Sequence, residues 1–278
     1  MEKKYKLTKE NIDFLGRTLY RIEALKDFDK VKKGDKGGFV ESENNLSQEG
    51  NCWVYNNAKV FDSAYICGDA IVINSARIFD NAIVFGSAKV CDNAKVFGDA
   101  RVYDNARVFG NARVCDNALV YDNARVFGNA EVWNNALVDD YAQVYDNAKV
   151  FGNVQVYSDA QIFGNAEVGD YVEIGDNAII CDNAQVFGNA LIFGNARICG
   201  YTKVCGNAEI KNSSDYIVFK NWWSSDRYFT WTRSNNMWKV GCFYGTGKEL
   251  IAKAYEDSEL SGREYERVVN YVESIIKQ

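Results

Sequence analysis

The feature that most constrains this chain is an unbroken six-residue repeat through its middle. An aliphatic residue recurs at every sixth position from Val54 to Ile210, which makes 27 consecutive units without an insertion or a shift of phase. A typical unit reads Ala-x-Val-[Phe/Tyr/Cys]-[Gly/Asp]-Asn, as in the run from Asp104 to Ala130. A fixed period of this kind predicts a solenoid, in which each unit packs only against its neighbours.

Each unit predicts one short strand followed by a turn. The Ala and the Val lie two positions apart and share one face of the strand, while the residue between them is mostly Lys, Arg, Gln or Glu and faces solvent. The Gly or Asp and the Asn that follow tolerate the positive φ of tight turns. Three units per triangular coil predict an all-β solenoid, a left-handed parallel β-helix of nine coils. Its length would be about 43 Å at a strand spacing of about 4.8 Å.

Two side-chain columns accompany this prediction. Stacked corner amides are expected to bond to one another along the axis; the positions are Asn105, Asn111, Asn117, Asn123 and Asn129. Most of the cysteines occupy the repeat position that elsewhere carries an aromatic ring, and we expect them to be small apolar substitutes without disulfides; they are Cys67, Cys91, Cys115, Cys181, Cys199 and Cys205. Without a CxxC pair or any histidine, the sequence predicts no metal site.

The repeat divides the chain into three parts: an N-terminal cap with a first irregular coil (1–50), the β-helix (51–211) and a C-terminal α+β cap (212–278). In the last part, DYIVFKNWW, RYFTWT and MWKVGCF predict three antiparallel strands. Two helices should follow, because Thr246 and Glu249, and again Ser261 and Glu264, have the spacing of a capping box. This part is either a structural cap that buries its Trp residues against the last coil or a module that binds a partner.

The chain also resembles a known family. VGDYVEIGDNAI (168–179) matches the hexapeptide signature of left-handed β-helix proteins, although elsewhere a ring or Cys replaces the small residue of that signature. The front segment beginning LYRIEALKDFDK, the DNARVFGNA array and the tail WKVGCFYGTGKEL are similar to the YdcK-like acyltransferase family of phages, prophages and bacteria. The resemblance implies the β-helix fold and a phage or prophage origin more firmly than it implies an activity.

The composition of the chain argues against acyl transfer, the reaction for which that family is named. Acyltransferases of this fold typically use a histidine as general base, and this chain has none. We therefore predict no catalytic residue and no cofactor. Asp139 and Asp140 are the alternative acid–base candidates, although a solvated corner explains them as well. An acyl-CoA-dependent acyltransferase with a base other than histidine stays as an alternative.

Two outward faces combine cations with rings, because residues eighteen apart stack on one face. The first places Lys89, Arg107 and Arg125 beside Cys91, Phe109 and Phe127; the second places Lys59, Arg77, Lys95 and Arg113 beside Phe61, Phe79, Phe97 and Cys115. Stacked like charges repel, so something should offset them. One interpretation uses corner carboxylates (Asp62, Asp80, Asp92, Asp116) and guanidinium–ring contacts. The other is an anionic, ring-bearing ligand such as a nucleotide.

The third face is more apolar and predicts homo-oligomerisation as a dimer or trimer. Its proposed interface residues are Ile83, Phe85, Tyr103, Leu119, Tyr121 and Leu137, with Tyr65, Leu191 and Phe193 extending the strip.

The formal charge of −6 and the pI of about 5.0 argue against nucleic-acid and membrane partners. The sequence has no signal-like or bilayer-spanning apolar run, which predicts a cytoplasmic location in a bacterial host. The leading hypothesis is a non-catalytic, oligomeric binding or scaffold protein, which in its sharper form sequesters a nucleotide-like signal as an anti-defence sponge. A phage structural component is a further alternative.

Overall fold

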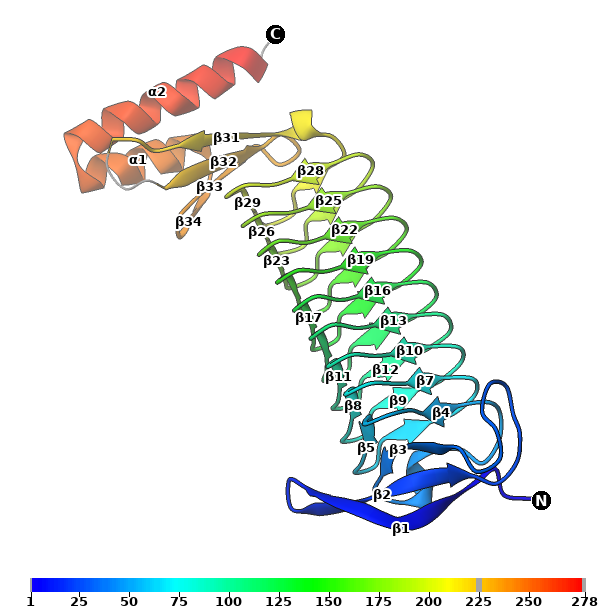
Figure 1. Ribbon diagram of the computed structural model, residues 1–278. Helices are drawn as coiled ribbons and strands as arrows, with labels where there is room; N and C mark the ends of the chain where they lie inside the picture. Colours follow the sequence, from blue (N-terminus) through cyan, green and yellow to red (C-terminus); the bar gives the residue numbers. More distant parts are fainter. Residues whose placement is uncertain (1, 224–226, 277–278) are drawn as a thin grey trace.

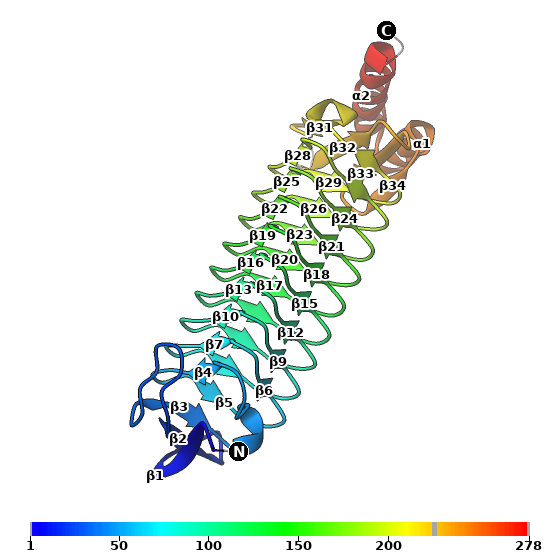
Figure 2. The ribbon, with the colours of Figure 1, turned by 90° about the vertical axis from the view of Figure 1, so that its right-hand side faces the viewer.

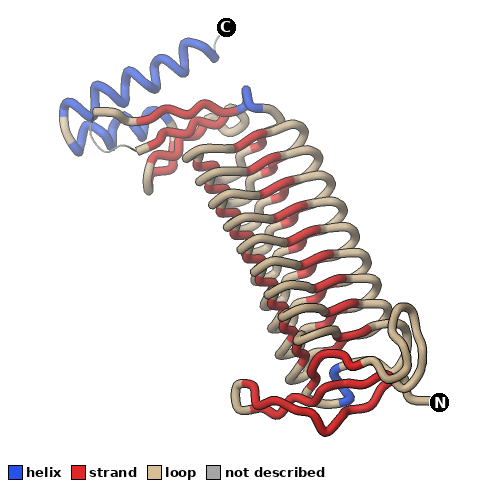
Figure 3. The backbone as a smooth tube through the Cα atoms, in the orientation of Figure 1, coloured by secondary structure: helices blue, strands red, loops and turns tan. Residues whose placement is uncertain are grey.

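The computed structural model describes residues 2–223 and 227–276, and most of them form one elongated solenoid (Figure 1). The strands β4 to β30 each have two residues and recur every six residues, from Trp53–Val54 to Glu209–Ile210. Figure 3 shows them as lines of short strands joined by turns. The predicted parallel β-helix is confirmed, because every repeat unit of the sequence forms one strand. Its left-handed sense stays a prediction.

Every third strand pairs in parallel with its copy one coil later, which produces three sheets along the axis (Figure 2). The β4 sheet contains β4 (Trp53–Val54), β7 (Ile71–Val72), β10 (Lys89–Val90), β13 (Arg107–Val108), β16 (Arg125–Val126), β19 (Gln143–Val144), β22 (Gln161–Ile162), β25 (Ile179–Ile180) and β28 (Arg197–Ile198). The β5 sheet contains β5 (Lys59–Val60), β8 (Arg77–Ile78), β11 (Lys95–Val96), β14 (Arg113–Val114), β17 (Glu131–Val132), β20 (Lys149–Val150), β23 (Glu167–Val168), β26 (Gln185–Val186) and β29 (Lys203–Val204). The β6 sheet contains β6 (Tyr65–Ile66), β9 (Ile83–Val84), β12 (Arg101–Val102), β15 (Leu119–Val120), β18 (Leu137–Val138), β21 (Gln155–Val156), β24 (Glu173–Ile174), β27 (Leu191–Ile192) and β30 (Glu209–Ile210).

The interior of the β-helix is a column of small aliphatic side chains. From Ala58 and Val60 to Ala208 and Ile210, the Ala and the Val or Ile of nearly every unit are fully buried. The residue between them is at least partly exposed in every unit from Lys59 to Glu209, as the alternation predicts, whereas Trp53 of the first unit is buried. The same few side chains therefore build every layer, and each added coil buries another set of apolar atoms.

The corners depend on left-handed backbone conformations, which Asp and Gly supply. Asp104 and Asp116 have φ angles of 54° and 57°, and Gly98 and Gly110 have 68° and 72°. A side chain at Gly98 would also meet the backbone of the next coil, because a Cβ there would lie 2.7 Å from the amide nitrogen of Asp116. Glycine adopts this corner at the lowest steric cost, although Asp80 and Asp116 occupy the same corner one coil away with φ angles of 57° each.

The corner amides form the predicted ladder on two of the three edges. Asn111 donates to Asn129, and Asn129 to Asn147, both at 3.0 Å. Asn117 donates to Asn135 at 3.1 Å. Tyr141 follows Asn105 and Asn123 in the third column, where an amide would continue the row.

A short sheet extension closes the N-terminal end. β1 (Tyr5–Phe14) and β2 (Arg17–Ala24) form an antiparallel hairpin, and β3 (Lys36–Val40) joins β2 to β5. After the 3-10 turn η1 (Glu43–Asn45), Leu46 contributes to the core of an irregular first coil. Apolar and polar residues alternate in the segment TLYRIEAL, which forms most of β2, whereas the charged segment of β1 has no such alternation.

Lys4 fills the open end of the core, where it is only 1% exposed. Its ammonium group donates to the carbonyl oxygens of Glu49, Gly50 and Cys52 at 3.2, 3.3 and 3.0 Å. Burial lowers the pKa of Lys4, and the neighbouring Cys52 opposes the shift. These carbonyl groups belong to the first coil and have no preceding coil whose amides could bond to them. The Lys4 ammonium group serves as their hydrogen-bond donor instead.

The C-terminal part is a four-stranded antiparallel sheet covered by two helices. The strands are β31 (Tyr216–Lys220), β32 (Tyr228–Thr232), β33 (Met237–Val240) and β34 (Phe243–Gly245), and a second 3-10 turn, η2 (Ser213–Asp215), precedes them. The helices are α1 (Gly247–Asp257) and α2 (Glu259–Ile276). None of the helices in the described part of the chain is long and apolar enough to cross a membrane.

Three details of this part differ from the prediction. Gly241, with φ of 56°, reverses the chain inside MWKVGCF, so the segment forms two strands instead of one. The capping box of Thr246 and Glu249 is confirmed, but α2 begins at Glu259, before Ser261. Trp231 and Trp238 are buried with the two helices in a separate core, not in that of the β-helix.

Candidate ligand-binding surface

The corner carboxylates bond to backbone amides or to the hairpin, and among the described residues they do not pair directly with the stacked cations. Asp80 and Asp92 accept hydrogen bonds from the amide nitrogens of Gly98 and Gly110 in the next coil at 3.1 and 3.0 Å. Asp116 accepts in the same way from Asn134 at 3.1 Å. Asp62 pairs with Arg17 of the N-terminal hairpin. None of these four carboxylates forms an ion pair with a stacked cation among the described residues, although each keeps its negative charge at the corner.

On the β5 sheet, the arginine side chains contact aromatic rings, and one of them also forms an ion pair. Arg113 pairs with Glu131 at 3.1 Å and lies 5.5 Å from the centre of the Phe97 ring. Arg77 lies 5.0 Å from the ring of Phe14, which comes from the β1–β2 hairpin. The guanidinium–ring interpretation holds on this face. Sequence reasoning missed Phe14 because nothing in the repeat indicates that the hairpin folds back over it.

The hairpin also covers a shallow hollow on the β5 sheet. The hollow has a volume of about 420 Å³ and lies between the hairpin turn and the ring stack. Its lining residues are Leu15, Arg17, Phe61, Asp62, Arg77, Phe79 and Lys95. Asp62 and Arg17 pair across its wall, so the charge in this hollow is partly balanced.

The β4 sheet differs, because its stacked cations have no such partners. Lys89, Arg107 and Arg125 lie on the consecutive strands β10, β13 and β16 and are all exposed. Among residues 2–223 and 227–276, no carboxylate forms an ion pair with them and no ring lies under them. We call these three residues the β4-sheet ladder. Its like charges lie one strand spacing apart, about 4.8 Å, and repel one another.

An aromatic column runs beside the β4-sheet ladder. Phe109 and Phe127 stack with ring centres 4.7 Å apart, and Tyr145 continues the stack at 4.8 Å. Rings inside such a column have both faces covered by neighbours. At the end of the column, Phe109 has Cys91 as its neighbour in place of a ring. Cys91 is smaller than a ring, so one face of Phe109 is less covered than the faces of Phe127, which has a ring on each side.

The Cys91 thiol adds no negative charge next to the ladder. Burial and the nearby Asp92 carboxylate raise the pKa of Cys91, while Arg107 and Lys89 act in the opposite direction. The side chain is thus a neutral thiol near neutral pH. This end of the column combines a ring face, a small neutral side chain and two cations that form no ion pair with a described residue.

Asp139 does not lie at a solvated corner. It is half-buried between Tyr121 and Tyr157 in the aromatic column of the β6 sheet, and its Oδ2 accepts a hydrogen bond from the Tyr121 hydroxyl at 2.5 Å. Its Oδ1 is buried without a hydrogen-bond partner among the described residues. Desolvation raises the pKa of Asp139, and the Tyr121 bond partly opposes this. Asp140 is exposed and binds the amide of Ser158 at 3.0 Å, like other corner carboxylates.

The proposed interface strip lies on the β6 sheet, where Arg101 interrupts it. Arg101 pairs in register with Ile83 on one side and Leu119 on the other, and Leu137 follows. The rings of Phe85, Tyr103 and Tyr121 stack beside the strands at 4.7 and 4.9 Å. The strip is thus two apolar patches separated by a cation, a feature that the sequence already contained.

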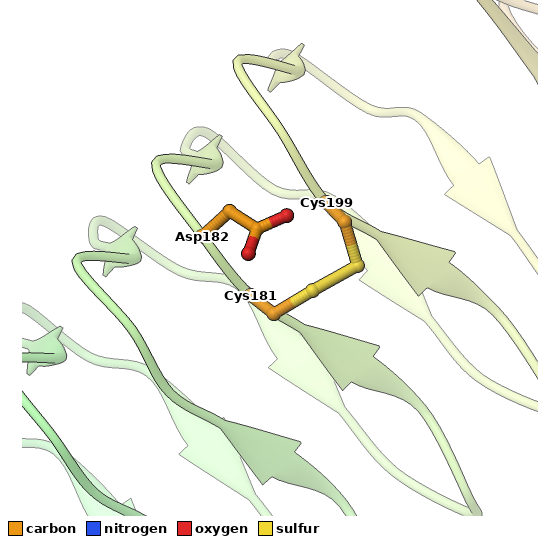
Figure 4. Close-up of side chains that lie close together, drawn as sticks. All are labelled: Cys181, Asp182 and Cys199. Carbon is orange, nitrogen blue, oxygen red and sulfur yellow. A yellow bond between two sulfur atoms is a disulfide. The ribbon is translucent and has the colours of Figure 1, made fainter.

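Two cysteines link adjacent coils of the β4 sheet (Figure 4). Cys181 and Cys199 occupy the same repeat position one coil apart and form a disulfide, with Cα atoms 4.6 Å apart. The prediction that these side chains are only small apolar substitutes is wrong for this pair. Asp182 lies beside the two sulfurs, and the three possible ligand atoms lie within 4.8 Å of one another.

The position of Asp182 has a structural explanation. Its Oδ2 accepts a hydrogen bond from the Gly200 amide at 2.9 Å, as Asp170 does from Gly188 at 2.8 Å. With the sulfurs bonded to each other, the cluster is a covalent link between coils next to an ordinary corner carboxylate.

Comparisons with known proteins agree with the repeat architecture. A family profile described as the YdcK β-solenoid repeat matches residues 76–92, 100–116, 112–128, 142–158 and 184–200. A protein of Escherichia coli (strain K12), named "Uncharacterized acetyltransferase YdcK", is 43% identical over 63 residues. That match covers 22% of this chain and 18% of the relative, so the chain spans less than a fifth of the relative's length.

Proposed function

Since this chain is built from YdcK-type β-solenoid repeats, we propose that it is a non-catalytic binding module that captures an anionic, ring-bearing small molecule on the β4-sheet ladder. One observation carries the proposal: Lys89, Arg107 and Arg125 stack without acidic partners among the described residues, next to the Phe109 ring at the end of its column. A phosphate group would reduce the repulsion within the ladder, because arginine binds phosphate oxygens with two parallel hydrogen bonds.

The ligand class follows from both halves of this site. Cations without acidic partners favour a phosphate or a similar anion, and the Phe109 face favours a planar ring. A nucleotide combines the two. In a protein of phage or prophage origin, which the family resemblance implies, such binding would sequester a nucleotide signal of a host defence system.

Calorimetric titration with cyclic AMP, AMP and cyclic di-GMP tests the proposal, with adenosine and inorganic phosphate as half-ligands. We expect one nucleotide to bind saturably and more tightly than either half. Arg107→Gln should weaken binding about tenfold, the size of one lost charge-assisted contact. Arg197→Gln, which removes the same exposed charge from the same sheet at β28, is the matched control and should change the Kd less than twofold. Absence of saturable binding, or equal losses in both variants, would refute the assignment.

We also propose a homo-oligomer formed through the two apolar patches of the β6 sheet. Leu119 and Leu137 are in register on β15 and β18 and form one of these patches. Static light scattering tests this, and a mass of 31.3 kDa at micromolar concentration would show a monomer and exclude it. Leu119→Glu should dissociate the oligomer, whereas Gln155→Glu on the next strand of that sheet should not.

Asp139 favours a second candidate function, acyl transfer with a carboxylate base. A carboxyl group with a raised pKa next to a tyrosine hydroxyl has the properties of an acid–base pair, and the relative from Escherichia coli is named an acetyltransferase. Release of CoA from acetyl-CoA in the presence of amine or sugar acceptors, abolished in Asp139→Asn, would establish it. Saturable nucleotide binding without acetyl-CoA turnover would favour the binding module.

A further inference from the structure

A second cationic site lies where the last coil meets the C-terminal sheet. There, β29 contacts β32 and β33. Two adjoining hollows of about 400 and 410 Å³ open at this junction, and Lys203 and Gly241 line both of them. We call them together the junction pocket. Neither hollow contains a residue of the β4-sheet ladder, so this site is independent of the function proposed above.

The charges of the junction pocket have one sign. The first hollow is lined by Arg227 and Lys220 in addition to Lys203, and the second by Lys239. Lys220 has contacts of its own. Lys203, Arg227 and Lys239 form no ion pair with any described residue, and no described residue that lines either hollow carries a carboxylate. This concentration of positive charge occurs on a chain whose formal net charge is −6.

Contacts between the last coil and the C-terminal sheet position the residues that line the junction pocket. The amide of Lys203 donates to the hydroxyl of the buried Thr230, which fixes the backbone of β29 against β32. Tyr201 and Tyr228 stack with ring centres 4.8 Å apart and form one side of the first hollow. The Arg227 side chain lies against Gly241, where a Cβ would come within 3.3 Å of its Cδ. The junction pocket is therefore formed where the last coil of the β-helix packs against the C-terminal sheet.

A neutral thiol lines the second hollow. Burial raises the pKa of Cys205, Lys239 and Lys203 lower it, and the Asp170 carboxylate adds a smaller rise. The thiol does not neutralise the two ammonium groups near neutral pH. Cys242, which is exposed, lines the same hollow and provides a chemical probe of its occupancy.

We propose that the junction pocket binds a small phosphate-bearing anion, with Lys203 between the two hollows and Arg227 and Lys239 on either side of it. Three cations around connected hollows suit an anion with more than one charge, and a guanidinium group matches the geometry of phosphate oxygens. A singly charged carboxylate would leave most of this charge unbalanced.

Titration of the full chain with inorganic pyrophosphate tests the proposal. We expect saturable binding at one site, weakened at least tenfold in Lys203→Gln/Lys239→Gln. The double variant Lys211→Gln/Lys248→Gln removes two charges from the same end of the chain outside both hollows and should change the Kd less than twofold. Lys89→Gln/Arg107→Gln should also keep pyrophosphate binding at this site, which separates failure of the ladder from failure of the pocket.

Thiol labelling gives a second readout that does not depend on affinity alone. Bound pyrophosphate should slow the alkylation of Cys242 by iodoacetamide and leave that of Cys91, in the distant β4-sheet site, unchanged. Absence of saturable binding, equal losses in the two double variants or unprotected Cys242 would each overturn the assignment.

Discussion

The backbone amide of Lys203 donates a hydrogen bond of 3.0 Å to the side-chain hydroxyl of Thr230. Inside the β-helix, the equivalent amide of Gln185 donates to the carbonyl oxygen of Thr202 in the next coil. Lys203 belongs to the last strand of the β5 sheet and has no following coil, so Thr230 of β32 supplies the acceptor. Ser234 accepts from the Glu209 amide at 2.7 Å on the β6 sheet in the same way.

Thr230→Val should destabilise the protein by about 1–3 kcal/mol, because a nearly isosteric side chain leaves the Lys203 amide buried without an acceptor. Thr230→Ser keeps the hydroxyl and should recover most of this loss. Chemical denaturation followed by circular dichroism measures both variants. Equal stability of the Val variant and the wild type would show that the terminal amide does not need this acceptor.

Removing one cation from the β4-sheet ladder should stabilise the free protein. Arg107→Gln relieves repulsion on both sides and should raise the free energy of unfolding by about 0.5 kcal/mol at low salt, an effect that salt reduces. Arg113→Gln is the contrasting variant, because it removes the partner of Glu131 and should lower stability by a few tenths of a kcal/mol. Thermal unfolding at low and high ionic strength compares the two, and a destabilised Arg107→Gln would mean that the ladder is already compensated.

Asp139 should make stability depend on pH in the acidic range. Its pKa is raised above the ordinary value of 3.8 in the folded state. The folded protein therefore binds a proton more readily than the unfolded chain, and the cost of ionising this group is present in full above the folded pKa and disappears below 3.8. Relative to Asp139→Asn, the wild type should gain stability as pH falls through that window.

The control for this titration is Asp159→Asn, which changes an exposed carboxylate in the next coil. Denaturation series between neutral pH and about pH 3.5, near the ordinary carboxyl range, measure all three proteins. A constant difference between wild type and Asp139→Asn at every pH would contradict the assigned shift.

Breaking the disulfide should loosen the later coils. Cys181 and Cys199 are 18 positions apart in the sequence, and closing a loop of that size stabilises a protein by about 3 kcal/mol in the chain-entropy account. Cys181→Ala/Cys199→Ala should lose a stabilisation of that order, whereas Cys67→Ala/Cys91→Ala, at free thiols of the same repeat position, should lose less. Peptide mass spectrometry without reductant that finds both thiols free would remove the basis of this prediction.

The β-helix could be predicted from the repeat because every coil has the same pattern of buried, exposed and turn-forming residues. Val and Ala at fixed spacing determine what is buried, and Gly or Asp at the corner determines where the chain turns. The outward neighbours followed from the same period, since Lys89 and Arg107 are paired as expected. The period could not show which ion pair or aromatic ring stabilises the charge of each outward side chain.

The features that sequence reasoning missed depend on single residues or on distant segments. Gly241 divides one predicted strand into two, because its positive φ reverses the chain. Phe14 covers part of the β5 sheet only because the β1–β2 hairpin folds back on it. The Cys181–Cys199 bond requires two cysteines in successive coils of one column, a coincidence that was readable from the eighteen-residue spacing.

Because all coils have the same height, their number determines the distance between the two ends of the molecule. The N-terminal hairpin and the C-terminal sheet lie at opposite ends of the β-helix (Figure 1). Because one coil adds about 4.8 Å of length, gain or loss of three hexapeptides would move the two ends apart or together by one such step without a change to either end. Related proteins with different numbers of coils could therefore carry the same terminal surfaces at different separations.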